Sequence, residues 1–529
     1  MKSRLVVWVA LGLILLGAAA IRLRLLDTPL DRDEGEYAYF GQLLLQGVPP
    51  YAAAYNLKAP GIYVAYAMIL AAFGQTTAGV HLGVIVVTSA TTVLMFVLAR
   101  RLAGPAAGLA ASGVHAVQAL NPKLLGLAGY AEHFVLLFLV AACIALQPEA
   151  RARRPSMLVT SGFFFALAFL MKQSAAAFVV GGVLFLLLSR SNGETTPWPG
   201  RLRATGFFLG GAAAPLVLAG LALWLAGTIR TFVFWSFVYG ANYSAPLSAG
   251  WSNLVERFMF VVPSSSLTVA VGAIGLGALV RDRRRPQAMF ILLLTAVSCI
   301  ATTVGLHFRP QYCILLLPAL ALLTATGFDA LGRLLVSRSG VLGRAVPVVL
   351  VVALLGQPLY ASWRVLFKLR PAEASRVIYG DNPFSESREI ARYIREHTAP
   401  GDRIAVIGSE PQIYFYSGRR SATGYIYTYA LMELQPFASA MQQQMIREIE
   451  SADPRYLVFV RVAGSWLYQE NSDQTIFGWF DQYHRTFKRV GVVDILPRRG
   501  TVYRWDADAV GYTPRSDMWL MIFERGRTP

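Results

Sequence analysis

Four carboxylates lie within six residues, directly after the first long apolar stretch of the chain: Asp31, Asp33, Glu34 and Glu36. Carboxylates this close repel one another, so the cluster costs free energy unless it has a purpose. An Asp and a Glu at the edge of an apolar layer can act as a general base, because low polarity raises carboxylate basicity. The same oxygens could ligate a divalent cation. The alternative is a solvated loop that caps a helix over residues 37–46.

Isolated charges in apolar surroundings form four further motifs: Lys58-Ala59-Pro60-Gly61, Tyr130-Ala131-Glu132-His133, Met171-Lys172-Gln173-Ser174 and His307-Phe308-Arg309-Pro310. A lysine can meet a phosphate as a point charge, and an arginine can grip two phosphate oxygens at once. We consider Glu132 a stronger candidate than His133 for a chemical role, since a lone histidine is usually structural. The alternative for Lys58 is a lysine whose ammonium reaches to the membrane interface. The alternative for the Lys172 and Arg309 motifs is an ordinary tight turn.

Apolar runs dominate the rest of the chain, and 55% of its residues are hydrophobic. A helix that spans a bilayer needs about 20 largely apolar residues. Eleven stretches are candidates: 5–25, 80–99, 105–121, 131–147, 157–171, 174–189, 206–226, 262–280, 287–306, 312–328 and 346–366. The first has no small-residue cleavage site, so we expect a retained helix and not a signal peptide.

The net charge of +18 would suggest a nucleic-acid partner in a soluble protein. Its distribution argues otherwise, because alternate connections between the apolar runs hold 17 basic and only four acidic residues. By the positive-inside rule these connections are cytoplasmic. We therefore expect a multi-pass membrane protein with a cytoplasmic N-terminus, an extracytoplasmic C-terminus and no nucleic-acid partner.

Composition also divides the chain into two predicted domains. Residues 1–366 form the membrane part, with an interfacial outer loop at 27–79. Residues 367–529 hold 21 basic and 19 acidic residues and have the pattern of a soluble, extracytoplasmic α/β domain. In that domain we expect helices at 386–397 and 433–451 and strands at 404–407 and 456–460. Residues 227–261 are rich in aromatics, which is typical of a segment in the headgroup zone.

The predicted topology brings the candidate residues to one membrane face. They are Asp33, Glu34, Lys58, Glu132, Lys172, His307 and Arg309. Acids for deprotonation and cations for a phosphate would meet there, as suits a reaction with a lipid-borne phosphate leaving group. The chain has no GxxxxGK[ST], HExxH or GxSxG motif, which disfavours an ATP-driven pump or a metalloprotease. Its three cysteines lie in apolar runs, so neither a zinc site nor a disulfide scaffold is expected.

These motifs resemble those of the GT-C glycosyltransferases, especially glycosyltransferase family 39. That group includes protein O-mannosyltransferases and bacterial 4-amino-4-deoxy-L-arabinose lipid A transferases. The resemblance rests on Asp33-Glu34 with Tyr37-Ala38 after the first span, Lys58-Ala59-Pro60-Gly61 about 25 residues later, and Glu132 in the second outer loop. It implies a polytopic α-helical GT-C fold in a bacterial inner membrane, with interfacial helices in the first outer loop and an extracytoplasmic C-terminal domain. It also implies that Asp33 is the catalytic carboxylate or its partner and that Lys58 binds the donor's phosphate.

From both arguments we predict an inverting hexosyl- or pentosyltransferase that uses a polyprenyl-phosphate donor and an extracytoplasmic lipid, glycan or protein hydroxyl. Asp33 would be the general base, with Glu34 or Glu132 as further catalytic carboxylates. Lys58, Lys172, His307, Arg309 and Tyr37 would bind the substrate. We expect no cofactor and no metal. Two other classes stay open: a metal-dependent enzyme of the oligosaccharyltransferase type, and a transporter or lipid flippase.

The stretch 408–419 also resembles segments of bacterial members of the group. Its Glu410 could reach over the site or simply close a turn between a strand and a helix.

Overall fold

The computed structural model describes residues 2–147, 154–188, 197–283, 285–336, 340–497 and 499–526. Several charges on which the predicted orientation depends fall outside this described part of the chain. They are Glu149, Arg151, Arg153, Arg190, Glu194, Arg284 and Arg338.

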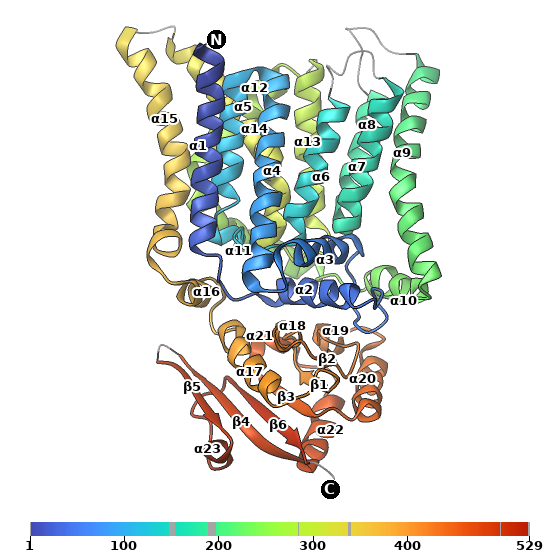
Figure 1. The fold of residues 1–529 in the computed structure, drawn as a ribbon. Helices are drawn as coiled ribbons and strands as arrows, with labels where there is room; N and C mark the ends of the chain where they lie inside the picture. Colours follow the sequence, from blue (N-terminus) through green and yellow to red (C-terminus); the bar gives the residue numbers. More distant parts are fainter. Residues whose placement is uncertain are drawn as a thin grey trace.

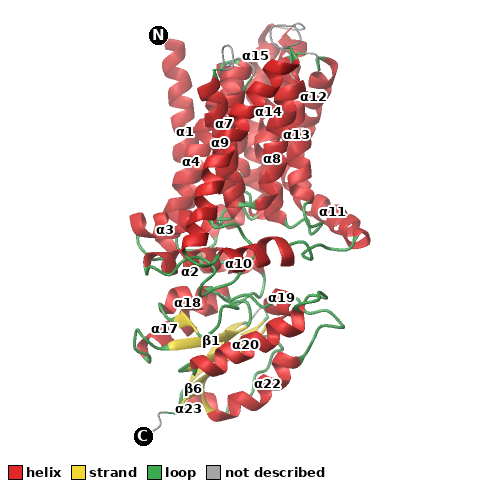
Figure 2. Cartoon of the chain, turned by 90° about the vertical axis from the view of Figure 1, so that its right-hand side faces the viewer, coloured by secondary structure: helices red, strands yellow, loops and turns green. Residues whose placement is uncertain are grey.

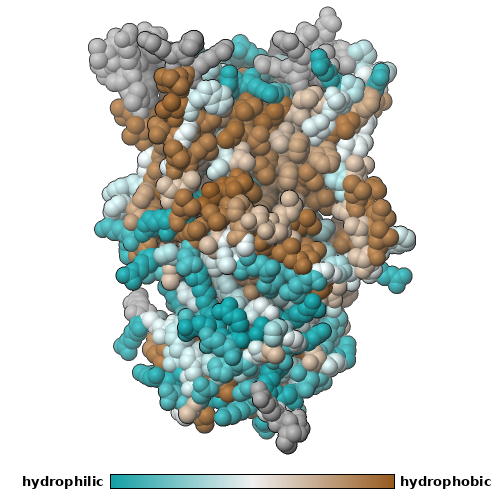
Figure 3. Space-filling view, in the orientation of Figure 1, coloured by the Kyte–Doolittle hydropathy of each residue, from teal (hydrophilic) through white to brown (hydrophobic). Residues whose placement is uncertain are grey.

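A bundle of roughly parallel helices fills one half of the molecule (Figure 1). Within the described residues its members are α1 (Lys2–Arg24), α4 (Thr77–Ala103), α5 (Pro105–Gln118), α6 (Ala131–Leu146), α7 (Pro155–Met171), α8 (Ala176–Leu188), α9 (Trp198–Leu225), α12 (Ser266–Arg281), α13 (Pro286–Thr303), α14 (Leu317–Val336) and α15 (Gly340–Ala361). Each predicted span coincides with one of these helices. Six helical stretches of the described chain are long and apolar enough to cross a bilayer on their own, and the others are shorter. The surface of the bundle is largely hydrophobic (Figure 3). The fold is therefore that of a polytopic α-helical membrane protein.

Short helices lie across one end of the bundle, opposite the N-terminus (Figure 1). They include α2 (Arg32–Leu45), α3 (Gly61–Phe73), α10 (Ile229–Val233), the π-helix η4 (Phe234–Tyr239) and α11 (Leu247–Val261). Helix α2 begins five residues before the predicted start at residue 37, because Asp31 caps it: its carboxylate accepts from the Glu34 backbone N–H at 2.9 Å. Helices α2 and α3 are the interfacial helices that the resemblance implies for the first outer loop, and the 13 residues of α3 are too few for a span.

The C-terminal part, which we call the sheet region (371–526), contains one six-stranded mixed sheet with the order β2-β1-β3-β6-β4-β5. The strands are β1 (Arg403–Ile407), β2 (Arg420–Ser421), β3 (Tyr456–Arg461), β4 (Phe487–Leu496), β5 (Gly500–Trp505) and β6 (Trp519–Arg525). Strand β1 pairs in parallel with β2 and β3, whereas β6 is antiparallel to β3 and β4.

Helices precede and connect these strands in the sequence. They are α16 (Pro371–Tyr379), α17 (Phe384–Glu396), α18 (Gln412–Ser417), α19 (Tyr429–Met432), α20 (Ala438–Ala452), α21 (Ala463–Trp466), α22 (Thr475–Tyr483) and α23 (Ala507–Val510). The predicted helix at 433–451 starts at residue 438 instead, because Pro436 disfavours helical backbone at the residue before it.

Helix α2 joins the bundle to the sheet region, which lies directly below it (Figure 2). A methyl group on Gly35 would lie 2.6 Å from Cβ of Gln412, so only glycine allows α2 and α18 to pack this closely. The Arg32 guanidinium is 2.6 Å from the Glu410 carboxylate, which is fully buried. Glu410 therefore anchors the junction and does not line the site described next.

Candidate active site

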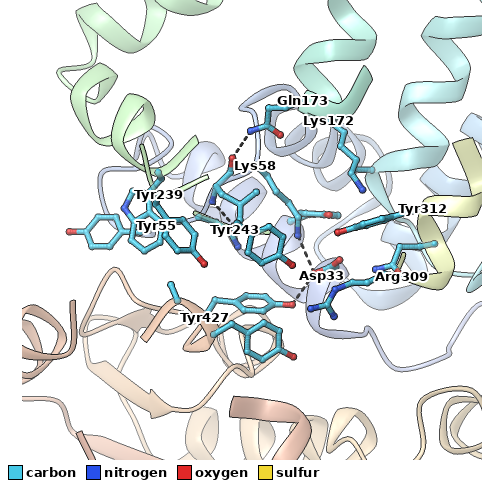
Figure 4. Close-up of a pocket in the computed structure, with 18 of the residues that line it drawn as sticks. Asp33, Tyr55, Lys58, Lys172, Gln173, Tyr239, Tyr243, Arg309, Tyr312 and Tyr427 are labelled. Carbon is cyan, nitrogen blue, oxygen red and sulfur yellow. Dashed lines mark hydrogen bonds and ion pairs between the residues drawn. The ribbon is translucent and has the colours of Figure 1, made fainter. Parts of the chain in front are cut away.

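A polar cavity of about 120 Å³ opens at this junction (Figure 4). Its walls come from α2, the chain before α3, the starts of α6 and η3 (Gln173–Ala175), η4, the start of η6 (Pro310–Leu316) and the loop before α19. Six of the eight predicted site residues line it: Asp33, Tyr37, Lys58, Glu132, Lys172 and Arg309. Residues more than 270 positions apart in the sequence thus meet in one place.

Asp33 lies at the centre of the hydrogen bonds in this cavity. Its Oδ1 accepts from Lys58 Nζ at 3.1 Å and from the Tyr427 hydroxyl at 2.9 Å. Burial alone would raise the pKa of Asp33, but the Lys58 ammonium and the Tyr427 hydroxyl bring that pKa below its usual value. Asp33 is therefore ionised at neutral pH, with its charge directed into the cavity.

Lys58 bridges two carboxylates, because its ammonium is also 3.1 Å from Glu36 Oε2. Burial opposes its charge, yet Asp33 and Glu36 raise the pKa of Lys58 above the usual value. Glu36 lies one helical turn after Asp33 and also accepts from the Tyr63 hydroxyl at 2.8 Å. Burial raises the pKa of Glu36 to about 7, even though Lys58 opposes that shift. We had not singled out Glu36 as a site residue, although its i, i+3 spacing from Asp33 gives the signal.

Glu132 and Lys172 form a second ion pair on another wall of the cavity. The Lys172 ammonium also lies 3.7 Å from the centre of the Tyr312 ring. Glu132 is buried at the start of α6, so this pair neutralises a charge that would be costly alone.

Arg309 has no such partner, since no carboxylate of the described residues lies within 4.0 Å of its guanidinium. It lies over the Tyr429 ring, 6.0 Å from the ring centre, and next to Tyr243 (Figure 4). Among the lining residues three cations, Lys58, Lys172 and Arg309, face two carboxylates. Lys58 and Lys172 contact carboxylates, whereas Arg309 contacts none of the described ones, so its guanidinium is the cation that is available to a phosphate.

Two predicted residues lie elsewhere. Glu34 points away from the cavity, where its carboxylate accepts from the Gly129 N–H at 2.6 Å and lies 3.2 Å from His81. His307 packs against Tyr243 with 4.6 Å between ring centres and the rings tilted by 41°, outside the cavity lining. Burial and the nearby Arg309 lower the pKa of His307 to about 4, so its imidazole is neutral at pH 7.

Several aromatic side chains that line the cavity were not among the predicted site residues: Tyr55, Trp235, Tyr239, Tyr243, Tyr312, Tyr427 and Tyr429. Tyr427 and Tyr429 belong to the sheet region, and their approach to α2 depends on how the two parts of the molecule pack. The aromatic segment 227–261 was the nearest hint.

A second, apolar cavity of about 300 Å³ lies beside the first, between α11, α12, α13 and α14. Its lining includes Leu254, Phe258, Val269, Leu316 and Leu320. The two cavities share Tyr312, and no other described residue lines both. A polar chamber with an available cation thus adjoins an apolar one, as an amphipathic ligand requires.

The carboxylates of the site do not form a metal cage. Within the described chain no group of three or more His, Cys, Asp and Glu is placed to hold a metal ion. Instead, the Lys58 ammonium occupies the position between Asp33 and Glu36.

Comparisons with known proteins agree with this architecture. The family model for dolichyl-phosphate-mannose-protein mannosyltransferases matches residues 57–226, about a third of the chain. That segment contains Lys58, Glu132 and Lys172. A search of curated protein sequences finds no match.

Solved structures match over nearly the whole chain. The crystal structure of ArnT from Cupriavidus metallidurans bound to undecaprenyl phosphate has a TM-score of 0.62 at 15% identity, with 98% of both chains covered. The archaeal oligosaccharyltransferase AglB from Archaeoglobus fulgidus, in complex with an inhibitory peptide and a dolichol-phosphate, has a TM-score of 0.53 at 12% identity and covers 95% of this chain and 74% of AglB. The expected resemblance to GT-C glycosyltransferases is confirmed, and the fold is theirs.

Proposed function

We propose that this chain is an integral-membrane glycosyltransferase that moves a sugar from a polyprenyl-phosphate donor to an acceptor hydroxyl. The observation that carries the proposal is the junction of the two cavities at Tyr312. The apolar cavity suits an isoprenoid chain, and the polar cavity suits the phosphate and its sugar. Two structural neighbours are bound to such lipids: ArnT to undecaprenyl phosphate and AglB to a dolichol-phosphate.

Asp33 acts as the general base in this mechanism. Its carboxylate takes the proton of the acceptor hydroxyl as that oxygen attacks the anomeric carbon of the donor. The bond between the anomeric carbon and the phosphate oxygen breaks, and the polyprenyl phosphate leaves with the electron pair. A single displacement of this kind inverts the anomeric configuration.

The cations of the cavity stabilise the charge that develops on the leaving phosphate. Arg309 can form two parallel hydrogen bonds to phosphate oxygens, while Lys58 and Lys172 contribute as point charges. Lys58 already contacts Asp33 at 3.1 Å, so one ammonium can orient the base and meet the phosphate. Glu132 holds Lys172 in place, which makes Glu132 a positioning residue.

Two other classes of protein, a metal-dependent enzyme and a transporter, would require a different arrangement or a different outcome at this site. A metal-dependent enzyme would need the carboxylates around a cation, but the Lys58 ammonium already fills the space between Asp33 and Glu36. A transporter would move the lipid intact and leave the sugar–phosphate bond unbroken. Excess chelator should therefore leave transfer unchanged, and donor cleavage should accompany turnover. The sugar, hexose or pentose, follows from the donor that is cleaved.

Donor chain length tests the junction of the two cavities. We expect the purified protein to show a KM at least about tenfold lower for a long polyprenyl chain than for a two-isoprene chain, since each buried methylene contributes about 0.8 kcal/mol. Leu320→Trp fills the apolar cavity and should remove this preference without affecting the short donor. Leu221→Trp, on the exposed face of α9, is the matched control. Equal KM values for both donors in the wild type would contradict the proposal.

A further inference from the structure

A third cavity, of about 800 Å³, opens on the other side of the polar cavity. It lies between residues 52–55, residues 421–424 and α20, and we call it the loop cleft. Of the described residues, Tyr55 is the one that lines both the loop cleft and the polar cavity. In Figure 4 Tyr55 and Tyr312 stand on opposite sides of Lys58. Tyr55 thus lies between the polar cavity and the loop cleft, and Tyr312 lies between the polar cavity and the apolar cavity.

The lining of the loop cleft differs in kind from that of the apolar cavity. It contains no Leu, Ile, Val, Met, Phe or Trp among its described residues, and small or polar side chains make up nearly all of it. Two exposed arginines, Arg403 and Arg447, line it, and neither forms an ion pair with a carboxylate of the described chain. Glu448 also lines the cleft, where its carboxylate accepts hydrogen bonds from Tyr55, Thr423 and Gly424. The two arginines exceed this single carboxylate, so the surface suits a hydrated molecule with negative charge.

Tyr55 is attached to the sheet region at two points. Its backbone N–H donates to the Gly424 carbonyl at 2.7 Å, and its hydroxyl donates to Glu448 at 3.1 Å. A methyl group on Gly424 would overlap the Tyr55 ring, so the ring lies flush against the chain at this point. The backbone contact fixes the position of residue 55. The ring itself is held by the hydrogen bond to Glu448, by stacking on Trp235 at 5.9 Å between ring centres, and by an edge contact with Tyr425 at 5.3 Å.

We propose that the loop cleft is the acceptor entrance, that Tyr55 is its gate, and that the acceptor is a hydrated, anionic glycan chain. This inference rests on the proposed function, which requires a hydroxyl to reach Asp33. The donor lipid occupies the apolar cavity on the Tyr312 side, so the acceptor enters from the loop cleft on the Tyr55 side. A turn of the Tyr55 side chain about its Cα–Cβ bond breaks the hydrogen bond to Glu448 and the ring contacts with Trp235 and Tyr425, and it leaves the backbone contact intact. Apart from the Tyr55 ring, a lipid acceptor would find no large apolar side chain among the described residues of this cleft.

The first test asks where the sugar goes. Membranes that contain the protein receive radiolabelled polyprenyl-phosphate hexose or pentose, and the products are separated by phase partition, protease treatment and anion exchange. We expect the label in a protease-resistant, water-soluble and anionic fraction. Label on a new lipid, or on protease-sensitive material, overturns the proposal.

The second test blocks the cleft. Ala52→Trp, at its exposed edge, should lower transfer to the acceptor at least tenfold, while slow cleavage of the donor by water continues. Ala507→Trp, exposed on α23 and outside the cavities described above, is the matched control. Gly424→Ala should also impair transfer, by displacing the Tyr55 ring.

The combined Arg403→Gln and Arg447→Gln variant should raise the acceptor KM and remove its dependence on salt. Normal transfer by both the Ala52→Trp and the double arginine variant would overturn the entrance. A donor that stays uncleaved in the wild type would instead contradict the proposed function.

Discussion

The carboxylates on the two faces of α2 have different partners and different surroundings. On one face Asp33 and Glu36 meet the Lys58 ammonium beside the polar cavity. On the other face Asp31 caps the helix and accepts from the Tyr130 hydroxyl, and Glu34 accepts from the Gly129 backbone. Only the first face borders a space that a substrate can enter.

The difference lies in the partners. Backbone N–H groups hold Asp31 and Glu34 in place and connect α2 to the turn before α6, so these carboxylates stabilise the fold. Burial raises the pKa of Asp31, whereas Lys58 and Tyr427 bring that of Asp33 below its usual value. A cluster that looks uniform in sequence is thus divided by helical phase into a structural pair and a chemical pair.

The sharpest contrast is expected between Asp33→Asn and Glu34→Ala. Removing the base should lower the rate of sugar transfer by about 10²–10⁴-fold, while the donor still binds. Glu34→Ala should leave the rate per folded molecule close to that of the wild type. It should instead cost about 1–3 kcal/mol of stability, because the Gly129 N–H loses its acceptor. Initial rates and thermal unfolding in detergent check both outcomes, and the reverse pattern would exchange the two roles.

Arg309→Gln should have the next largest effect. The loss of an unpaired guanidinium should weaken donor binding by about 1.5–3 kcal/mol, or roughly 10- to 150-fold. Arg309→Lys should restore part of this loss, since it keeps the charge but not the paired geometry. A donor-binding isotherm is the measurement, and Arg392→Gln in an exposed ion pair is the control. Unchanged binding in Arg309→Gln would place the phosphate elsewhere.

Tyr427→Phe should have a moderate effect. It removes a 2.9 Å hydrogen bond to Asp33 and should lower kcat about tenfold, equivalent to about 1.4 kcal/mol. The exposed Tyr468→Phe substitution is the control. A change in KM alone would show that Tyr427 binds the substrate and does not orient the base.

The smallest expected effect concerns pH. Glu36 is neutral below its pKa of about 7 and charged above it, where it competes with the phosphate for Lys58. Donor affinity should therefore fall as the pH rises through 7, and Glu36→Gln should flatten this dependence. The same pKa shift predicts that the free energy of unfolding decreases as the pH rises from about 4.5 to 7. In this range Glu36 is protonated in the folded state and ionised in the unfolded state, so a higher pH favours unfolding. Identical profiles for wild type and Glu36→Gln would contradict this account.

Much of the membrane architecture can be predicted from the sequence. Apolar runs locate the helices of the bundle, and β1 and β3 lie where alternation and β-branched residues indicate strands. Strands β4, β5 and β6 were not predicted. Six of the eight predicted site residues line one cavity. This could be predicted because they lie at or near the ends of spans, and every such end lies at one membrane face or the other.

The sequence could not separate Glu34 from Asp33, because that depends on the helix start set by Asp31. It also could not place Tyr55 and Tyr427 in the site. Their positions follow from packing between α2 and a sheet region almost 400 residues away, which leaves no local pattern.

The most direct test of the account measures donor cleavage in the purified wild-type protein with excess chelator present. We predict that one polyprenyl phosphate is released for each sugar transferred, and that NMR of the product shows an inverted anomeric configuration. Transfer that stops when metal is removed, a retained configuration, or movement of an intact donor without cleavage would contradict it.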